Sequence, residues 1–481
     1  MDSEDGSCQF PLCETDYFRR LNLLCHECGG ALRGSYITAL DRKYHIEHFT
    51  CSVCPTVFGA QDSYYEHESK VYCHFHYSTQ FAQRCHGCHT AILKQFVEIF
   101  RNGQNQHWHP ECYMIHKFWN VRLSPAGQTW EPPPVDEDAS EEERKQIREE
   151  EDIMEEKVFN IWNTLSTFEE SSAACISDML LHVSNGAYLD GVLVAKRFIG
   201  HVEILFGAVD QLANYIKSHE LKGESTDPLD SSEPTANVTS ELSYGREAKL
   251  LCKKIVAFFA LLSKTQETGV RKLGVTQELL SLVTGLAHYL KLLIRIGLQG
   301  ALKLEREKSA PDGLHNFLEH LRDLESLAEL EDENAPLDLM AGVEGLADQL
   351  SDCCIACKEP IDDECVLLGQ SRWHIEPPHL SCSTCEKDLT AELFDALWSE
   401  AEEQAYCSDC ATQKNLGSTV RGGFIPVSKL QQFIFLLKVA LARLLAVLRS
   451  GGTLPHTSGE IYYHAPDPAS NLANLLRPRR P

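Results

Sequence analysis

The sequence lacks an excess of basic residues, a secretion signal and an uninterrupted apolar run. Lys and Arg number 44 against 70 Asp and Glu, and the net charge of −26 argues against binding of nucleic acid or anionic membranes by bulk electrostatic attraction. The N-terminus, MDSEDGSCQF, is acidic and has no apolar signal-peptide core. The two most apolar stretches, 279–302 and 430–448, carry charged residues in their interiors, which is costly in lipid. We therefore expect a soluble protein without a membrane span.

The sequence also lacks the motifs of common enzyme classes. It has no GxxxxGK[ST] phosphate-binding loop, no GxGxxG dinucleotide motif after a strand and no GxSxG nucleophile elbow. The histidines of the central region occur singly, and each is more readily explained as a surface or core residue than as a general base. We predict that the chain is not an enzyme and has no catalytic residues.

Cysteine is abundant by contrast, with twenty among 481 residues. Sixteen of the twenty lie in two blocks, residues 25–112 and 353–410, and only these blocks show regular spacing. In a cytosolic or nuclear protein, such cysteines are more often metal ligands than disulfides. A chain of this length is expected to form roughly three domains.

The two blocks repeat one pattern of four ligand pairs. In the first block the pairs are Cys25 and Cys28, His45 and His48, Cys51 and Cys54, and Cys73 and His76. In the second block they are Cys354 and Cys357, His374 and His379, Cys382 and Cys385, and Cys407 and Cys410. Tetrahedral Zn²⁺ takes four Cys or His ligands at about 2.0–2.3 Å. Eight ligands therefore suit two zinc sites packed side by side in each block.

These segments resemble LIM domains, in which the first two pairs share one zinc and the last two pairs share another. An aromatic residue precedes the first histidine in that family, and it recurs here as Tyr44 and Trp373. The resemblance implies four ligand sets: Cys25, Cys28, His45 and His48; Cys51, Cys54, Cys73 and His76; Cys354, Cys357, His374 and His379; Cys382, Cys385, Cys407 and Cys410.

A degenerate copy of the pattern lies between the blocks. Cys85, Cys88, His109 and Cys112 match the first half of a LIM domain, with Trp108 before the histidine. No CxxC follows, and Ile115 and Phe118 replace the cysteines of the second half. We expect one zinc here, with the second site lost and its space filled by apolar packing of Ile115, Phe118 and Trp119.

All five predicted sites are closed, because four protein ligands leave no position for water or substrate. Closed zinc sites fold small domains rather than catalyse reactions, so we expect about five structural Zn²⁺ per chain. A nucleic-acid-binding zinc finger would need a basic helix, which these segments lack. The remaining cysteines, including Cys175, Cys353 and Cys365, are expected to be ordinary thiols.

The fold class expected is multidomain, with small zinc-stabilised LIM modules of short β-hairpins flanking an all-α helical region. We predict a LIM domain at 23–79, a half LIM at 83–123, a linker and acidic helix at 124–157, a helical spacer at 158–350, a LIM domain at 352–413, an amphipathic helix at 427–449 and a disordered tail at 451–481. Ser140 and Glu143 have the spacing of a helix capping box. The stripe Leu430, Phe433, Leu437, Leu441, Leu444 and Leu448 should pack on another domain or a partner.

This order of segments resembles the N-terminal part of fungal LIM-domain Rho GTPase-activating proteins. In that family a RhoGAP domain follows the last LIM, and an arginine finger in a loop resembling GxxRxSG stabilises charge on the transferred phosphoryl group. The 71 residues after Cys410 contain no such loop, so we expect the RhoGAP domain to be absent from this chain.

The resemblance implies a protein–protein interaction scaffold in Rho GTPase signalling, active in cell-wall and polarity control. Its expected partners are proteins of the Rho-family GTPase pathway or the polarity machinery. One alternative is a fragment or truncated gene model of a full RhoGAP, with GTPase activator activity supplied outside this sequence. A weaker alternative is a LIM-only nuclear co-regulator. We expect a cytoplasmic location at sites of polarised growth, with the nucleus as the alternative.

Overall fold

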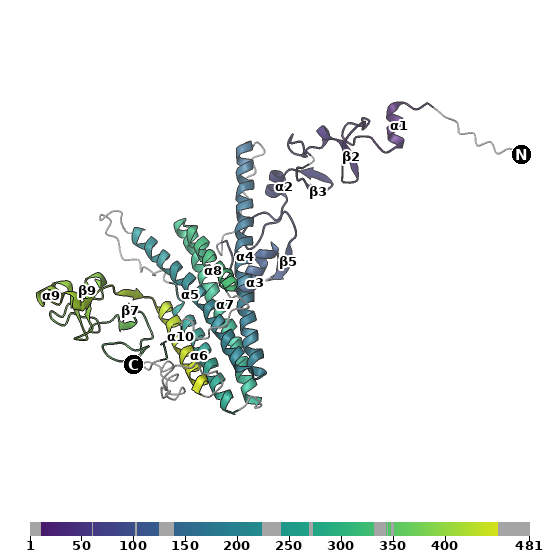
Figure 1. Cartoon of the computed structure of the whole chain (residues 1–481). Coiled ribbons are helices and arrows are strands. Elements are labelled where there is room, and N and C mark those ends of the chain that lie inside the picture. Colours follow the sequence, from purple (N-terminus) through teal and green to yellow (C-terminus); the bar gives the residue numbers. More distant parts are fainter. Residues whose placement is uncertain are drawn as a thin grey trace. The chain divides into compact units, whose positions relative to one another are not determined.

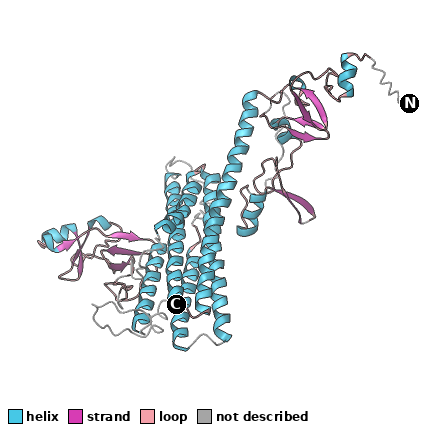
Figure 2. Ribbon diagram, turned by 45° about the vertical axis from the view of Figure 1, so that its right-hand side comes forward, coloured by secondary structure: helices cyan, strands magenta, loops and turns pink. Residues whose placement is uncertain are grey.

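The structure of the chain, a computed structural model, describes residues 11–59, 61–101, 103–124, 139–223, 242–268, 273–330, 343, 345–347 and 351–450. The chain forms two compact units, Met1–Trp162 and Asn163–Pro481. Strands gather in the cysteine-rich segments, and long helices make up most of the rest (Figure 2). Short β-hairpins and a mostly helical region agree with the expected fold class.

The first unit begins with two small modules built on β-hairpins. Its elements are α1 (Glu14–Arg20), β1 (Tyr36–Ala39), β2 (Arg42–His45), η1 (Ile46–His48), β3 (Tyr65–His67), β4 (Lys70–Tyr72), α2 (His74–Gln80), β5 (Val97–Arg101), β6 (Gln104–Trp108) and α3 (Pro110–Trp119). Each strand pair is antiparallel: β1 with β2, β3 with β4, and β5 with β6. Phe49 lies between the first two hairpins, where its ring contacts those of Tyr44, Phe58 and Tyr64.

Helix α4 (Glu141–Ser184) is one continuous helix. We predicted an acidic helix and a separate spacer domain divided at residue 157, but the helix crosses that boundary without a break. Its first turn has the expected capping box, in which the Ser140 N–H donates to Glu143 Oε2 (2.8 Å) and the Glu143 N–H donates to Ser140 Oγ (3.3 Å). It ends before Gly186, whose φ of +76° turns the chain toward the next helix.

The second unit contains a helical bundle. Its long helices are the C-terminal part of α4, α5 (Tyr188–Gly223), α6 (Gly245–Thr268), α7 (Leu273–Lys308), α8 (Asp312–Leu330) and α10 (Lys429–Ser450). Helix α7 packs on α5, α6 and α8, and α5 also packs on α8 (Figure 1). Gly297 lets α7 approach α8 closely, because a Cβ there would lie 2.5 Å from the Phe317 ring. The buried apolar stripes of these helices form one core.

Residues 277–308 of α7 are long and apolar enough, by length and composition alone, to cross a membrane. The core helices of water-soluble proteins meet the same criterion. The apolar stripe of α7, with Leu286, Leu293 and Leu298 fully buried, packs on the neighbouring helices, so we assign it to the bundle core.

The third module also lies in the second unit. Its elements are β7 (Cys365–Leu368), β8 (Ser371–His374), η2 (Leu393–Asp395), β9 (Ala396–Ser399), β10 (Gln404–Cys407), α9 (Ser408–Gln413), η3 (Gly417–Thr419), β11 (Val420–Arg421) and β12 (Ile425–Val427). Strand β11 pairs with β9, and β12 pairs with β7, so each hairpin gains a third strand. The module therefore reaches residue 427, beyond the predicted boundary at 413.

Helix α10 follows β12 after one residue and packs on α5 and α6 (Figure 1). All six residues of the predicted apolar stripe are buried. The partner that this stripe was expected to need is the chain's own bundle. The predicted tail at 451–481 and most of the predicted linker, residues 125–138, lie outside the described residues.

Candidate metal centres

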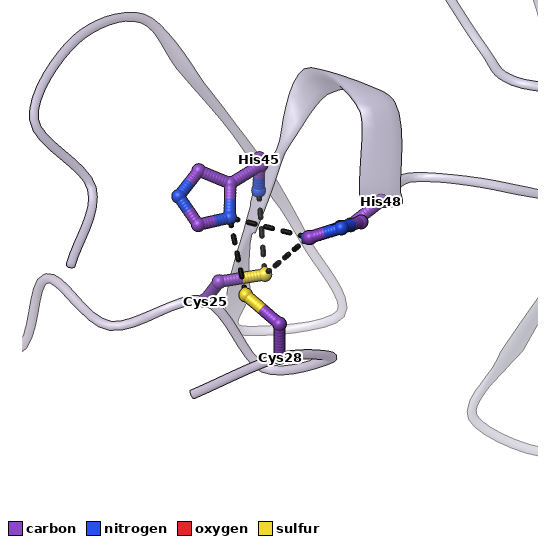
Figure 3. A group of neighbouring side chains, drawn as sticks. All are labelled: Cys25, Cys28, His45 and His48. Carbon is purple, nitrogen blue, oxygen red and sulfur yellow. Dashed lines mark hydrogen bonds between the residues drawn. The ribbon is translucent and has the colours of Figure 1, made fainter. Parts of the chain in front are cut away.

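The first cluster forms where a tight turn meets the end of a hairpin. Cys25 and Cys28 lie on a turn closed by the Gly29 N–H, which donates to the Cys25 carbonyl (2.9 Å), and Gly29 has a φ of +66°. His45 is the last residue of β2, and His48 is the last residue of η1. Figure 3 shows the two sulfurs and two imidazole rings of these residues converging on one point.

The spacing of these ligand atoms fits a tetrahedral zinc ion. Four Cys or His ligands at about 2.0–2.3 Å from the metal lie about 3.3–3.8 Å from one another. Here the His45 Nδ1 is 3.4 Å from the Cys28 Sγ and 3.2 Å from the His48 Nδ1, and the Cys25 Sγ is 3.6 Å from the His48 Nδ1. The donor atoms therefore already surround a zinc-sized space.

The structure brings all twenty predicted ligands together in the five expected groups, and the donor atoms of each group lie within 4.8 Å of one another. The separations again match a zinc tetrahedron: Cys51 Sγ to His76 Nδ1 3.5 Å, Cys54 Sγ to Cys73 Sγ 3.9 Å, Cys88 Sγ to His109 Nδ1 3.4 Å, Cys357 Sγ to His374 Nδ1 3.4 Å, and Cys385 Sγ to Cys407 Sγ 3.8 Å.

Three of the histidines are held in the same way by the backbone. The Nε2 atoms of His45, His109 and His374 lie 3.3, 3.2 and 3.4 Å from the carbonyl oxygens of Ala31, Ala91 and Pro360 respectively. A carbonyl oxygen only accepts, so Nε2–H is the donor and Nδ1 keeps its lone pair for a metal. The repeated carbonyl contact fixes both the tautomer and the ring orientation.

Backbone N–H groups also favour the thiolate form that binds zinc. Burial raises the pKa of Cys25, but hydrogen bonds to its sulfur outweigh that effect and lower the pKa to about 6. One of these bonds comes from the His45 N–H, which donates to the Cys25 Sγ (3.4 Å). The hydrogen bond with Cys73 is the largest cause that lowers the pKa of Cys51, to about 4. Cys25 and Cys51 therefore supply anionic sulfur at neutral pH, whereas the hydrogen bond with Cys51 raises the pKa of Cys73.

The half LIM holds one cluster and continues into α3 where a full module would form its second. Ile115 and Trp119 are buried as predicted. Phe118 is only partly buried, because 38% of its surface is exposed on α3. The expected apolar packing therefore holds for Ile115 and Trp119, and only in part for Phe118, whose ring contacts that of Trp119. His116 stacks on Trp108, with ring centroids 4.9 Å apart, and is in none of the five groups.

The aromatic residue before the first histidine of each module is buried inside the module. Tyr44, Trp108 and Trp373 are all buried, and Trp373 contacts Trp398 and Phe424 edge to face. Among the residues that the structure describes, each cluster groups four donors, a number that suits structural zinc rather than a catalytic ion.

The spacing pattern did not reveal a buried polar network that joins the third module to α10. Gln432, fully buried, donates to the Ile361 carbonyl (2.9 Å) and accepts from the Arg372 Nη1 (2.9 Å) and the Cys365 thiol (3.3 Å). The Arg372 guanidinium also lies 3.6 Å from the centroid of the Phe435 ring. Cys365, expected to be an ordinary thiol, belongs to this network. Its sequence signal is weak: one glutamine on the apolar face of α10.

A second contact fixes the same helix to the module. Arg443 donates to both carboxylate oxygens of Asp352, at 2.6 and 3.1 Å, and the two side chains are 14% and 8% exposed. Lys429 pairs with Asp363 nearer the start of α10. The third module is therefore attached to the bundle helices through α10 along much of that helix.

A family model of the LIM domain matches residues 25–81 and 354–415. These segments are LIM domains. They contain four of the five clusters, and the match confirms the predicted family of the two full LIM segments. LIM domains with five Cys/His clusters support about five structural Zn²⁺ per chain. The half LIM has the same cluster geometry and lies between the matched segments.

Two fungal proteins are similar to this LIM protein along nearly its whole length. It is 46% identical over 442 residues, 92% of the chain, to Rho-type GTPase-activating protein 1 of Schizosaccharomyces pombe. It is 32% identical over 449 residues, 90% of the chain, to Rho-GTPase-activating protein LRG1 of Saccharomyces cerevisiae. The chain spans 36% and 41% of the lengths of these two relatives.

A third relative is similar to a shorter part of the chain. Over 102 residues, 21% of the chain, the sequence is 31% identical to Paxillin homolog 1 of Caenorhabditis elegans. No solved structure matches the chain. The similarity to the two fungal proteins therefore carries the comparison, because it extends through the helical region as well as the LIM domains.

Proposed function

We propose that this chain is a zinc-folded interaction scaffold of Rho GTPase signalling, serving cell-wall and polarity control. One observation supports it above others: five closed four-donor clusters lie in a chain homologous, over nine-tenths of its length, to proteins named as Rho GTPase activators. The twenty clustered residues act as the zinc ligands. The zinc ions hold the LIM surfaces in shape, and those surfaces bind proteins.

The test is affinity purification with the zinc-loaded full chain from a fungal lysate, with quantitative mass spectrometry of the captured proteins. We expect enrichment of Rho-family GTPases, their regulators or polarity proteins. Cys51→Ala and Cys382→Ala each disrupt one site, so the variant that loses a partner identifies the LIM domain that binds it. Glu400→Ala, at an exposed ion pair with Arg421, is the control that keeps all partners.

The scaffold proposal fails if no Rho-pathway or polarity protein is enriched above a chelator-treated sample. It also fails if the captured set is the same for the zinc-loaded and chelated chains. We further propose a cytoplasmic location at sites of polarised growth. A fluorescent fusion at the native locus tests this, and accumulation in the nucleus would favour a co-regulator instead.

A second candidate is that the sequence is one part of a longer GTPase-activating protein. The lengths of the relatives favour this candidate. The chain spans only 36% and 41% of the two fungal proteins, which are named for that activity. Transcript sequencing past codon 481 tests it. An open frame that encodes a further helical domain with a GxxRxSG-like loop would support it. A stop codon directly after codon 481 would contradict it.

Both candidates lead to the same expectation for this chain in solution. In either case we expect this chain by itself not to stimulate GTP hydrolysis by Rho-family GTPases. Phosphate release from GTP-loaded Rho proteins, with and without the chain, measures this. Stimulation by the chain alone would show that the activating residues lie within it and would overturn this expectation.

A further inference from the structure

The first half of α4 carries a line of contacts with both modules of the first unit. Arg144, Glu151, Glu155 and Trp162 are separated by seven, four and seven residues, so they lie on one face of the helix. Each of the four contacts a residue of the LIM domain or the half LIM, in the order in which those modules follow along the chain. All of these contacts lie within the unit Met1–Trp162.

The first contacts are with the LIM domain. The Arg144 guanidinium lies 5.1 Å from the centroid of the Phe75 ring, and Phe75 is a buried residue of α2. Arg148, which lies one helical turn after Arg144, and Glu151 are within electrostatic range of Tyr65 in β3. The helix therefore lies beside the α2 side of the LIM domain (Figure 1).

Glu151 joins the two modules. Its carboxylate lies 3.1 Å from the His74 Nε2, at the start of α2, and 3.6 Å from the Arg84 Nη1, directly before the first cysteine of the half LIM. The side chains of Glu151, His74 and Arg84 are 12%, 13% and 20% exposed. The ion pair between Glu151 and Arg84 is therefore not a solvated surface contact, and removing Glu151 leaves a mostly buried guanidinium without its carboxylate.

The last contacts are with the half LIM. Glu155 pairs with Lys94 at 2.6 Å, although both side chains are largely exposed. The Trp162 ring lies 5.8 Å from that of Trp119 and 5.9 Å from that of Phe118, both on α3. Trp119 is 2% exposed, so Trp162 helps to cover the place where a full LIM domain would carry its second zinc site.

We propose that the first half of α4 is a built-in ligand of the LIM pair, which binds across the LIM domain and the half LIM and fixes their relative orientation. The surface it occupies fits an acidic amphipathic helix, since it offers His74, Arg84, Lys94 and the Phe75 ring. The acidic segment therefore packs on the two modules and is not a solvated helix. A partner protein binds to the LIM domain and the half LIM in one fixed relative orientation. This inference goes beyond the scaffold function and does not depend on any partner.

Hydrogen–deuterium exchange of the zinc-loaded full chain tests the proposal. Glu151→Lys should accelerate amide exchange in 141–156 and at the start of α2 by about a hundredfold or more, the order expected when one partner of a mostly buried ion pair is removed. Glu156→Lys makes the same charge change at an exposed position one turn away and should leave exchange unchanged. Native mass spectrometry should count five zinc ions in both variants.

A second pair of variants tests the other end of the contact line. Trp162→Ala should accelerate exchange in α3, whereas Phe159→Ala, which removes an aromatic ring that is 56% exposed on the same helix, should not. If Glu151→Lys loses zinc, the exchange of 141–156 is measured in Glu151→Gln instead, because this change removes the charge and keeps the shape of the side chain. The proposal is overturned if 141–156 exchange as an unprotected helix in the unaltered chain, or if Glu156→Lys accelerates exchange as much as Glu151→Lys.

Discussion

At the scale of single residues, each zinc ligand belongs to a set of four that the fold keeps separate from its neighbour. Cys51 belongs to the set with Cys54, Cys73 and His76, although it is only three residues from His48 of the adjacent set. Phe49, 2% exposed, lies in the core between the two hairpins that carry these sets. The two sites are therefore close in sequence but structurally distinct.

The first prediction is that Cys51→Ala lowers the zinc content from five ions to four. Three remaining ligands bind Zn²⁺ more weakly, while the four ligands of the neighbouring cluster are untouched. Native mass spectrometry of the purified chain measures the content directly. Phe118→Ala, a substitution away from any cluster, serves as the control and should keep five. Loss of two ions on Cys51→Ala would show that the neighbouring sites bind as one.

The second prediction concerns His201, a buried residue of α5. Its Nδ1 lies 3.0 Å from the Ser172 Oγ of α4, and burial, with Arg197 nearby, lowers its pKa from 6.5 to about 4. The unfolded chain takes up a proton at about pH 6.5 and the folded chain does not, so stability is complete above pH 6.5 and is lost as the pH falls toward 4. At pH 5.5 the loss should be about 1.4 kcal/mol.

Hydrogen exchange of α5 peptides at pH 7.5 and 5.5, corrected for intrinsic rates, measures this loss locally, where release of zinc from the LIM domains does not obscure it. His201→Gln removes the titrating group and should abolish that part of the pH dependence. An unchanged pH dependence in His201→Gln would assign the effect to other groups of the bundle.

At the scale of secondary-structure elements, α10 has two kinds of contact on one helix. Its apolar stripe packs on α5 and α6, and its polar residues Gln432 and Arg443 bond to the third LIM module. The helix follows directly from β12, which is paired with β7 of that module. The strand and the helix thus join a zinc-stabilised module to a helical bundle by both backbone and side-chain bonds.

The third prediction is that Gln432→Leu loosens this attachment. The change leaves the Ile361 carbonyl and the Arg372 guanidinium without their partner, at a cost of about 1–3 kcal/mol for each buried group. Exchange should accelerate in α10 and in β7–β8 while the core of α7 stays protected. Gln431→Leu is the matched control, since Gln431 is exposed and only caps the helix through the Ser428 N–H. Equal effects of the two substitutions would exclude a special role for Gln432.

At the scale of the whole molecule, zinc and apolar burial stabilise different parts of the chain. The LIM modules have small cores, whereas the bundle buries Phe198, Phe206, Phe258 and Phe259 completely. Structural zinc contributes about 10–16 kcal/mol in small peptides, comparable with or above the stability of a whole domain. The modules should therefore depend on the metal and the bundle should not.

The fourth prediction is that chelation unfolds the LIM modules and weakens only one part of the bundle. Segments 25–119 and 354–410 should lose exchange protection when zinc is removed, while α7 and α8 keep theirs. Helix α10 should lose part of its protection, because the third module supplies partners to Gln432 and Arg443. Retention of protection in the LIM segments without zinc would contradict the structural role of the metal. A count of six zinc ions before chelation would mean a second site in the half LIM, and four would mean none.

The zinc clusters and the LIM family were predictable from the sequence because their signal is local. Ligands such as Cys25 and Cys28 must stand three residues apart on one turn, and His45 and Cys51 must follow at short distances along the chain. The helices were predictable for a similar reason, since the stripe from Leu430 to Leu448 repeats with the period of an α-helix. Both the zinc clusters and the helices depend on local geometry, which produces a regular spacing of residues in the sequence.

The sequence by itself determined which residues cluster around zinc, that an all-α region separates the modules and that α10 has one apolar face. Only the tertiary structure decided that α4 continues past residue 157, that Glu151 bridges His74 and Arg84, and that Gln432 reaches the backbone of Ile361. These contacts join residues far apart in the chain, and nothing in the local spacing of a glutamate or a glutamine marks the partner it will meet. Such pairings are fixed by how whole elements pack, because burial of apolar surface sets where the helices lie and the polar groups are then paired where that packing places them.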